Sequence, residues 1–235
     1  MSKRLILASN NAKKLKELQA LIAPLGVELV TQGSLGIPEA EEPHVTFVEN
    51  ALAKARHAAA AASGPALADD SGLCVDALGG APGVRSARHA VDAGRIAEGL
   101  PCEQIDAANN DWLLTQMQGQ AQRGAHFTCV LVAVRHADDP EPLIAEGHWR
   151  GELLEAAQGE HGFGYDPLLW VPAHGCSAAQ LAPAIKNAVS HRALACQQLL
   201  SMMQARWGLD AAQQSTQGPQ GPQESQRPNW PWQHP

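Results

Sequence analysis

Residues 66–73 read Ala66-Leu67-Ala68-Asp69-Asp70-Ser71-Gly72-Leu73, an apolar run that stops at two adjacent carboxylates, a hydroxyl and a glycine. The first three residues predict a short buried strand, and Gly72 permits the tight backbone that would bring the acids to a cleft. Because side chains alternate along a strand, Asp69 and Asp70 should point in different directions. One then holds structure while the other faces a ligand, unless the segment is an Asp-rich turn.

Composition limits the classes of function. The chain has 235 residues, of which 45% are hydrophobic, so it can build one large domain or two smaller lobes. Its formal net charge of −7 argues against the broad basic surface that nonspecific nucleic-acid binding needs. We expect no nucleic-acid partner, and any polyanion that binds should be small and locally held.

The cysteines and the apolar runs bear on localisation. The five cysteines contain no CxxC pair, so we predict neither a disulfide framework nor a zinc site, but reduced and mostly buried thiols. The apolar run at residues 5–8 is too short for a signal peptide, and no run approaches the length of a membrane span. We therefore expect a cytoplasmic protein without a membrane partner.

The first 26 residues predict a strand, a polar loop and a helix. Residues 5–8 are apolar, residues 9–14 are polar, and leucines at helical spacing follow until Pro24 and Gly26 end the pattern. Such a loop gathers backbone N–H groups at the positive end of a helix dipole, and Lys14 adds a full charge, which favours an anion. No GxxxxGK[ST] loop is present, and helix capping by the asparagines is the alternative.

The next segments predict a second strand over residues 27–30, an acidic loop over 38–43, and a helix. Thr46 and Glu49 form a capping box before an alanine-rich stretch that should stay helical to about residue 63. On this helix Asn50, Lys54 and His57 share one polar face, which is solvated unless it lines a cleft.

Later elements change the expected pairing of strands. A glycine-rich loop at residues 79–83 and a helix over 105–117 precede a strand over 126–135, which a turn at 137–140 connects to a strand over 143–149. This hairpin adds an antiparallel part to the preceding β-α-β-α pattern, so the sheet should be mixed. A last helix is predicted over residues 183–207.

Two polar clusters follow the hairpin. Residues 159–167 contain three glycines and the only tyrosine, and a glycine-flanked aromatic in a loop is better placed to stack on a flat ring than to fill a core. Phe163 is thus a candidate base platform, with a turn anchored by an aromatic as the alternative. Lys186, His191 and Arg192 are near the start of the last helix, where they would bind a carbonyl or phosphate unless they form a surface charge cluster.

The composition changes at the C-terminal end. Residues 210–235 are rich in Gln, Pro, Gly and Ser, which cannot build a core. We predict one folded domain over residues 1–209 and a disordered tail over 210–235.

The separate signals describe one ligand. A nucleoside triphosphate with Mg²⁺ would use all of them: an anion site near Lys14, carboxylates at Glu42 and Asp70, an aromatic ring at Phe163 and a cation at Arg192. Mg²⁺ is usually held by one or two carboxylates, and phosphate oxygens and water complete its shell.

The same residues, in their order along the chain, resemble the inosine/xanthosine triphosphate pyrophosphatase family. The resemblance extends to about residue 207. Its motifs are Ser9-x-Asn11-x-x-Lys14, Glu42, Thr46-Phe47-Val48-Glu49-Asn50-Ala51, Asp69-Asp70-Ser71-Gly72-Leu73, Gly79-Gly80-Ala81-Pro82-Gly83, Phe163-Gly164-Tyr165-Asp166-Pro167 and Ser190-His191-Arg192.

The resemblance implies a fold and a reaction. The fold would be α/β, with a long mixed central sheet flanked by helices and an active-site cleft between two lobes. The protein would form a homodimer. The reaction would be Mg²⁺-dependent hydrolysis of ITP, dITP and XTP to the nucleoside monophosphate and pyrophosphate, which cleanses the nucleotide pool of deaminated purines.

The resemblance also implies a role for each matching residue. Asp70 would be the general base and a metal ligand, and Glu42 the second metal contact. The implied substrate contacts are Ser9, Asn10, Asn11, Ala12, Lys13, Lys14 and Lys54 at the triphosphate, Ser71, Phe163 stacked on the base, Gly164, Tyr165 and Asp166 around the nucleoside, and Lys186, His191 and Arg192 at the 6-keto edge of the base.

Two other functions stay open at this point. One is a house-cleaning pyrophosphatase for other modified nucleotides. The other is a non-catalytic nucleotide-binding regulator in which Asp70 binds metal without turnover. No residue of the sequence indicates how the 2-amino group of GTP would be rejected.

Overall fold

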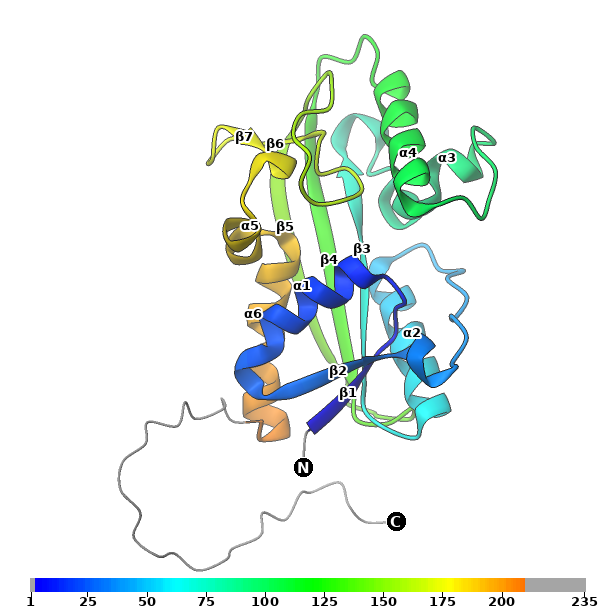
Figure 1. The fold of residues 1–235 in the computed structure, drawn as a ribbon, viewed down its shortest axis with the longest axis vertical. Coiled ribbons are helices and arrows are strands. Elements are labelled where there is room, and N and C mark those ends of the chain that lie inside the picture. Colours follow the sequence, from blue (N-terminus) through cyan, green and yellow to red (C-terminus); the bar gives the residue numbers. More distant parts are fainter. Residues whose placement is uncertain (1–2, 210–235) are drawn as a thin grey trace, which may run out of the picture.

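A mixed sheet of seven strands runs through residues 3–209, the part of the chain that this computed structural model describes (Figure 1). In chain order the strands are β1 (Lys3–Leu7), β2 (Val27–Thr31), β3 (Ala66–Val75), β4 (Gly124–Val134), β5 (Leu143–Leu153), β6 (Leu169–Val171) and β7 (Cys176–Ser177). Their order across the sheet is β2-β1-β3-β4-β5-β6-β7. Strand β1 pairs parallel with β2 and β3, and the remaining pairs are antiparallel. The predicted mixed sheet is confirmed.

Helices cover both faces of this sheet (Figure 1). Helices α1 and α6 pack on one face, where Leu18 and Leu199 share a core with Leu131 of β4. Helix α2 packs on the other face, where Ala55 shares a core with Val132. The helices are α1 (Ala12–Ile22), α2 (Phe47–Ala62), α3 (His89–Asp92), α4 (Cys102–Gln116), α5 (Pro183–Val189) and α6 (His191–Trp207), and the short 3-10 segments include η2 (Gln32–Leu35) and η4 (Gly83–Arg88).

Strand β3 presents its two acids to opposite faces. Leu67 belongs to the core under α1 and α6, whereas Ala66 and Ala68 belong to the core under α2. Because side chains alternate along a strand, Asp69 faces α1 and α6 and Asp70 faces α2. The predicted difference in direction is confirmed.

The predicted turn at Gly72 is wrong. The strand continues through Gly72 to Val75. A Cβ atom at Gly72 would lie 2.4 Å from both the carbonyl oxygen of Gly83 and the Oγ of Ser86, so this glycine makes room for η4 beside the strand. A close approach of backbone, and not a turn, therefore explains the glycine.

The loop that carries Phe163 contains a second correction. The sequence predicts that a glycine-flanked aromatic in this loop does not fill a core, but Tyr165 is buried among Leu73, Leu168 and Trp149, and its hydroxyl donates to the carbonyl of Ser86 at 3.0 Å. A phenol is stable in a core when its hydroxyl has a buried acceptor, so a glycine beside the aromatic residue does not exclude it from the core.

The predicted last helix is two helices. Ser190 has an extended backbone (φ −69°, ψ 162°), ends α5, and caps α6 by accepting a hydrogen bond from Ala193 N at 3.3 Å. This break lets Lys186 and Arg192 approach one pocket from different helices. Helix α4 also begins earlier than predicted, at Cys102, and β5 runs to Leu153.

Other expectations have mixed outcomes. Thr46 caps α2 as predicted, by accepting from Glu49 N at 3.3 Å. All five cysteines are free, but only Cys129 and Cys196 are buried, so the thiols are not mostly buried. Among residues 3–209 no helix is long and apolar enough to cross a membrane. The predicted tail, residues 210–235, lies outside the described residues.

Candidate active site

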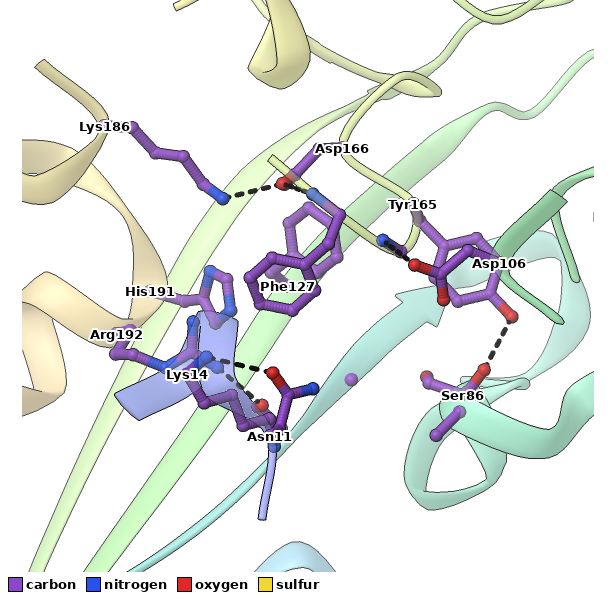
Figure 2. Close-up of a pocket in the computed structure, with 15 residues that line it drawn as sticks. Asn11, Lys14, Ser86, Asp106, Phe127, Tyr165, Asp166, Lys186, His191 and Arg192 are labelled. Atoms are coloured by element: carbon purple, nitrogen blue, oxygen red, sulfur yellow. Dashed lines mark hydrogen bonds and ion pairs between the residues drawn. The ribbon is translucent and has the colours of Figure 1, made fainter. Parts of the chain in front are cut away.

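Two adjoining pockets lie where the first turn of α1 meets the centre of the sheet. Asn11 and Lys14 line both of them. We call one the aromatic pocket, because Phe127, Phe163 and Tyr165 line it (Figure 2). We call the other the acidic pocket, because its lining includes Glu39, Glu41, Glu42 and Asp69.

The loop after β1 is organised by helix capping. The side chain of Asn11 accepts hydrogen bonds from Lys13 N at 2.9 Å and Lys14 N at 3.0 Å, and Ser9 Oγ accepts from Asn11 N at 3.2 Å. The capping explanation thus holds for the side chain of Asn11. It does not compete with an anion site, because the capped helix still directs its positive end at the pockets.

Three predicted substrate contacts line neither pocket. Asn10 donates to Glu39 Oε1 at 3.0 Å and accepts from Gly33 N at 2.9 Å, so its side chain ties the loop to the neighbouring segment. Lys13 forms an exposed ion pair with Glu103 at 3.3 Å. Ala12 is the first residue of α1. Among residues 9–14, the structure brings Ser9, Asn11 and Lys14 to the pockets.

Asp69 is buried and fully partnered. Its carboxylate accepts from Lys14 Nζ at 2.6 Å, Arg192 Nε at 2.8 Å and Ser71 Oγ at 2.8 Å. Burial alone would raise the pKa of Asp69, but the charges of Arg192 and Lys14 hold it well below 3.8. Asp69 is therefore ionised and fixes two of the predicted substrate-binding cations.

Asp70 faces a different environment. Lys54 Nζ donates to Asp70 Oδ1 at 2.8 Å, Glu42 Oε1 at 2.7 Å and the carbonyl of Asp69 at 3.0 Å, which uses all three of its N–H bonds. The second carboxylate oxygen of Asp70, Oδ2, is buried and has no hydrogen-bond partner. On the polar face of α2, Lys54 therefore lines the acidic pocket, whereas the buried Asn50 bonds the backbone of His44.

The pKa values of this cluster follow from burial and from Lys54. Burial raises the pKa of Asp70 above 3.8 by more than the nearby ammonium lowers it. Burial also opposes ionisation of Glu42, yet the charge of Lys54 keeps the pKa of Glu42 lowered. Although burial alone would lower the pKa of Lys54, the charges of Asp70 and Glu42 raise it.

The cluster fits a hard divalent cation. An unpartnered buried carboxylate oxygen is costly without a proton or a cation, and Asp70 Oδ2 is such an oxygen. Within residues 3–209 no group of three or more His, Cys, Asp or Glu side chains is arranged to hold a metal ion. A metal here would take Glu42 and Asp70 and complete its shell with water and phosphate oxygens, as Mg²⁺ does.

The aromatic pocket combines a ring with two held cations. Lys186 Nζ lies 5.0 Å from the ring centre of Phe163, and the guanidinium of Arg192 lies 5.8 Å from it. Asp166 accepts from Lys186 Nζ at 2.6 Å and from Phe163 N at 2.9 Å, so it fixes both the cation and the loop (Figure 2). Ser71 and Gly164 complete the predicted contacts that line this pocket.

His191 is a neutral, stacked side chain. Burial, together with the charges of Arg192 and Lys186, keeps the pKa of His191 well below 6.5. Its ring stacks on Phe127 at 4.8 Å between ring centres, and its Nδ1 atom is buried without a partner. A neutral imidazole can offer either a donor or an acceptor to a ligand.

Several residues of the site were not predicted. Glu17 accepts from both Lys186 and Arg192, and Asp106 accepts from Gly164 N at 2.9 Å. Phe127 lines the aromatic pocket and Arg88 the acidic pocket. Glu17 follows Lys14 by three positions on a helix, but its partners lie 169 and 175 residues away, so no local pattern indicates the contact.

Comparison with known proteins gives a consistent result. The model of the Ham1 family matches residues 5–202. The dITP/XTP pyrophosphatase of Leptothrix cholodnii is 63% identical over 210 residues, which cover 88% of this chain and 99% of the relative. The dITP/XTP pyrophosphatase of Ralstonia nicotianae is 60% identical over 201 residues, which cover 86% of this chain and 96% of the relative.

Solved structures agree with the sequence comparison. A HAM1 protein from Coxiella burnetii superposes with a TM-score of 0.77 at 41% identity, covering 86% of this chain and 99% of that one. The Ham1 protein of Staphylococcus aureus superposes with a TM-score of 0.73 at 33% identity, with the same two coverages. The described fold, an open mixed sheet flanked by helices, is shared with both.

Proposed function

The chain belongs to the Ham1 family, and from that premise we infer that it hydrolyses non-canonical purine nucleoside triphosphates with release of pyrophosphate. We propose the reaction as the cleavage of ITP, dITP and XTP to the nucleoside monophosphate and pyrophosphate, with Mg²⁺ as cofactor. Deaminated purines would thereby be kept out of DNA and RNA.

One observation carries this proposal. The aromatic pocket and the acidic pocket meet at Asn11 and Lys14, so a ligand with a flat base at one end and phosphates at the other would fit both. Lys54, which lines the acidic pocket, donates to Asp70, whose Oδ2 atom is buried and lacks a partner. A nucleotide held in this way brings its phosphates to an unsatisfied carboxylate.

Asp70 is suited to act as the general base. Burial raises the pKa of Asp70, which makes it a better proton acceptor than an ordinary aspartate. Lys54 holds Asp70 Oδ1 and leaves Oδ2 for the proton of an attacking water. Lys14 and Lys54 would offset the charge of the phosphates. When bound between Glu42 and Asp70, Mg²⁺ supplies a Lewis acid that polarises a phosphoryl oxygen.

The base pocket supports selection for a 6-keto purine. Lys186 and Arg192 are buried donors beside Phe163, on which the base would stack. A 6-keto oxygen can accept from the N–H groups that the carboxylate partners of Lys186 and Arg192 leave free, whereas the 6-amino group of adenine cannot, at a cost of about 1–3 kcal/mol per unpaired group. His191 would add a contact at the same edge, and Gly164, Tyr165 and Asp166 would shape the nucleoside pocket.

The loop after β1 would bind the triphosphate mainly through its backbone. We assign this role to residues 9–14, in which Ser9 and Asn11 use their side chains to shape the loop. Asn10, Ala12 and Lys13 line neither pocket, so any contact that they make would come from N–H groups at the start of α1. Ser71 would contact the substrate from β3.

The test measures pyrophosphate release from dITP and XTP against GTP, ATP and dUTP, with and without Mg²⁺. The native chain is compared with Asp70→Asn and with Asp138→Asn, a matched change on the exposed β4–β5 turn. We expect metal-dependent turnover of dITP and XTP that is lost in Asp70→Asn alone. Turnover of dUTP instead would favour a pyrophosphatase for other modified nucleotides, and stabilisation by dITP without pyrophosphate release would favour a regulator.

We also propose that the chain acts as a cytoplasmic homodimer, and that residues 1–209 form the pyrophosphatase domain. Light scattering during size-exclusion chromatography gives the mass of the assembly. Cell fractionation tests the location.

A further inference from the structure

Glu42 lies on a segment that has no regular structure of its own. Residues 37–46, between η2 and α2, contain no helix or strand. Ordering such a segment costs conformational entropy, so a metal ligand on it needs anchors. Two anchors come from α2: His57 Nε2 contacts the carbonyl of Pro38 at 2.9 Å, and the side chain of Asn50 bonds the backbone N and O of His44 at 3.1 and 3.2 Å.

A third anchor comes from the opposite side of the acidic pocket. Arg88, the last residue of η4, donates from Nη2 to the backbone carbonyl of Glu42 at 3.2 Å. Its Nε atom lies 3.6 Å from Asp92, four residues further along the chain. The guanidinium thus bridges η4 and the segment that carries Glu42, and it lines the acidic pocket while doing so.

Segment η4, which carries Arg88, is fixed by hydrogen bonds at Ser86. The carbonyl of Ser86 accepts from the Tyr165 hydroxyl at 3.0 Å and from Asn109 Nδ2 at 3.2 Å. The Ser86 hydroxyl donates to the carbonyl of Gly83 at 2.6 Å and accepts from Leu73 N at 2.9 Å. Segment η4 is therefore tied to β3, to α4 and, through the Tyr165 hydroxyl (Figure 2), to the wall of the aromatic pocket. Arg88 thus extends from a segment that is fixed at several points.

We propose that Arg88 is a positioning residue, which holds the backbone at Glu42 so that the carboxylates of Glu42 and Asp70 face one divalent cation. The inference rests on the proposed function, because it concerns the metal that the acidic pocket would hold. Arg88 fixes the backbone of Glu42 and Lys54 fixes its carboxylate, and neither contact replaces the other. Groups that orient a metal ligand in this way commonly change metal affinity or activity by about 10–100-fold when removed.

Arg85 provides a matched control on the same segment. It also lies on η4 and also pairs with Asp92, with its Nη1 atom 3.6 Å from the carboxylate. It lines neither pocket and has no contact with Glu42 among the described residues. A change at Arg85 therefore removes the same charge and the same ion-pair partner without touching the segment of Glu42.

The experiment compares Arg88→Gln, Arg88→Lys and Arg85→Gln with the native chain and with Asp70→Asn. The main readout is the dissociation constant for Mn²⁺ alone, measured by electron paramagnetic resonance of the free ion. We expect Arg88→Gln to weaken Mn²⁺ binding roughly tenfold and to raise the Mg²⁺ concentration for half-maximal turnover by a similar factor. Arg88→Lys should recover part of the loss, because an ammonium can donate to the same carbonyl, and Arg85→Gln should behave as native.

Two results would overturn the role of Arg88 alone. In one, Arg88→Gln binds Mn²⁺ as tightly as Arg85→Gln does. In the other, Arg88→Gln weakens binding of inorganic tripolyphosphate in the absence of metal but leaves Mn²⁺ binding intact, which would make Arg88 a direct phosphate contact. If the native chain binds Mn²⁺ no better than Asp70→Asn does, the metal site and the role of Arg88 fail together. Intact Mn²⁺ binding without pyrophosphate release would instead refute the proposed function alone.

Discussion

Asp69 and Asp70 are adjacent in sequence but differ in the hydrogen-bond partners of their carboxylates. Asp69 is 1% exposed, and three side chains donate to its carboxylate at 2.6 to 2.8 Å. Asp70 is 6% exposed, shares one ammonium with Glu42, and keeps a buried oxygen without a partner. The two side chains are thus almost equally buried, and the number of donors on each face of the sheet decides which carboxylate is fully paired and which keeps an oxygen without a partner.

The pKa values record the same difference. The pKa of Asp69 is held well below 3.8, because the cations of Arg192 and Lys14 outweigh its burial, whereas burial outweighs Lys54 and raises the pKa of Asp70. Removing a partner from a fully paired buried charge destabilises the fold, whereas a buried carboxylate oxygen without a partner is able to bind a ligand.

The largest effect should come from a change at Asp70, the acid that we propose as the general base. Asp70→Asn removes the proposed base and a metal ligand, so we expect pyrophosphate release from dITP to fall on the order of a thousandfold. The free energy of unfolding should change by less than about 1 kcal/mol, because the amide oxygen still accepts from Lys54 and a buried charge is lost. Steady-state kinetics and urea unfolding of the same sample measure both. Unchanged turnover would show that Asp70 is a second structural acid.

Asp69→Asn should show the reverse pattern. The change leaves Arg192 and Lys14 buried without their counter-charge, which costs about 3–5 kcal/mol when one partner of a buried pair is removed. Urea unfolding followed by circular dichroism measures the loss of unfolding free energy. If Asp69→Asn is as stable as Asp70→Asn, the contrast between the two faces is wrong.

Acid should reveal the different signs of the two pKa shifts. The folded-state pKa of Asp69 is lowered, so its stabilisation is complete above the unfolded pKa near 3.8 and is lost as pH falls through the folded value. The difference in unfolding free energy between the native chain and Asp69→Asn should therefore stay constant from pH 7 to about 5 and shrink below 3.8.

The folded-state pKa of Asp70 is raised, so protonation near that value favours the folded state. The unfolding free energy of the native chain should therefore rise relative to that of Asp70→Asn as pH falls. Unfolding in urea at stepped pH values tests both directions.

The smallest effect concerns the residue that supports Asp69. Ser71 donates to Asp69 Oδ1 at 2.8 Å and accepts from Arg192 Nη2 at 3.0 Å. Ser71→Ala should lower the free energy of unfolding by about 1 kcal/mol, the usual net value of such hydrogen bonds. In the Asp69→Asn variant, Ser71→Ala should lower the free energy of unfolding by less than it does in the native chain, because the hydrogen bonds that join Ser71, Asp69 and Arg192 are already disrupted. If Ser71→Ala lowers the free energy of unfolding equally in the native chain and in Asp69→Asn, Ser71 and Asp69 are not coupled.

Local patterns predicted much of the fold. The strands at residues 27–30 and 143–149, the capped helix after Thr46 and the mixed sheet are found, because hydrophobic period and capping chemistry act over a few residues. The errors occur where packing overrides composition. Gly72 allows η4 to approach and makes no turn, and Tyr165 fills a core because its hydroxyl reaches Ser86.

The site was predicted as a set of residues but not as a network. Lys54, Phe163 and Arg192 line the two pockets, and Asp70 contacts Lys54 beside them. The partners that set their chemistry were missed, such as Glu17 for Arg192 and Arg88 for the backbone of Glu42. Their sequence separations leave no periodic signal that would pair them.

The sequence by itself determined that Asp69 and Asp70 point apart, since that follows from the pleat of any strand. It also determined the family, through motifs that keep their order along the chain. Only the tertiary structure decided which acid is structural, because the donors that distinguish them come from Lys14, 55 residues before Asp69, and Arg192, 123 residues after it. Charges so far apart in the chain act on each other only once the sheet and its helices bring them within a few ångströms, where burial strengthens the interaction.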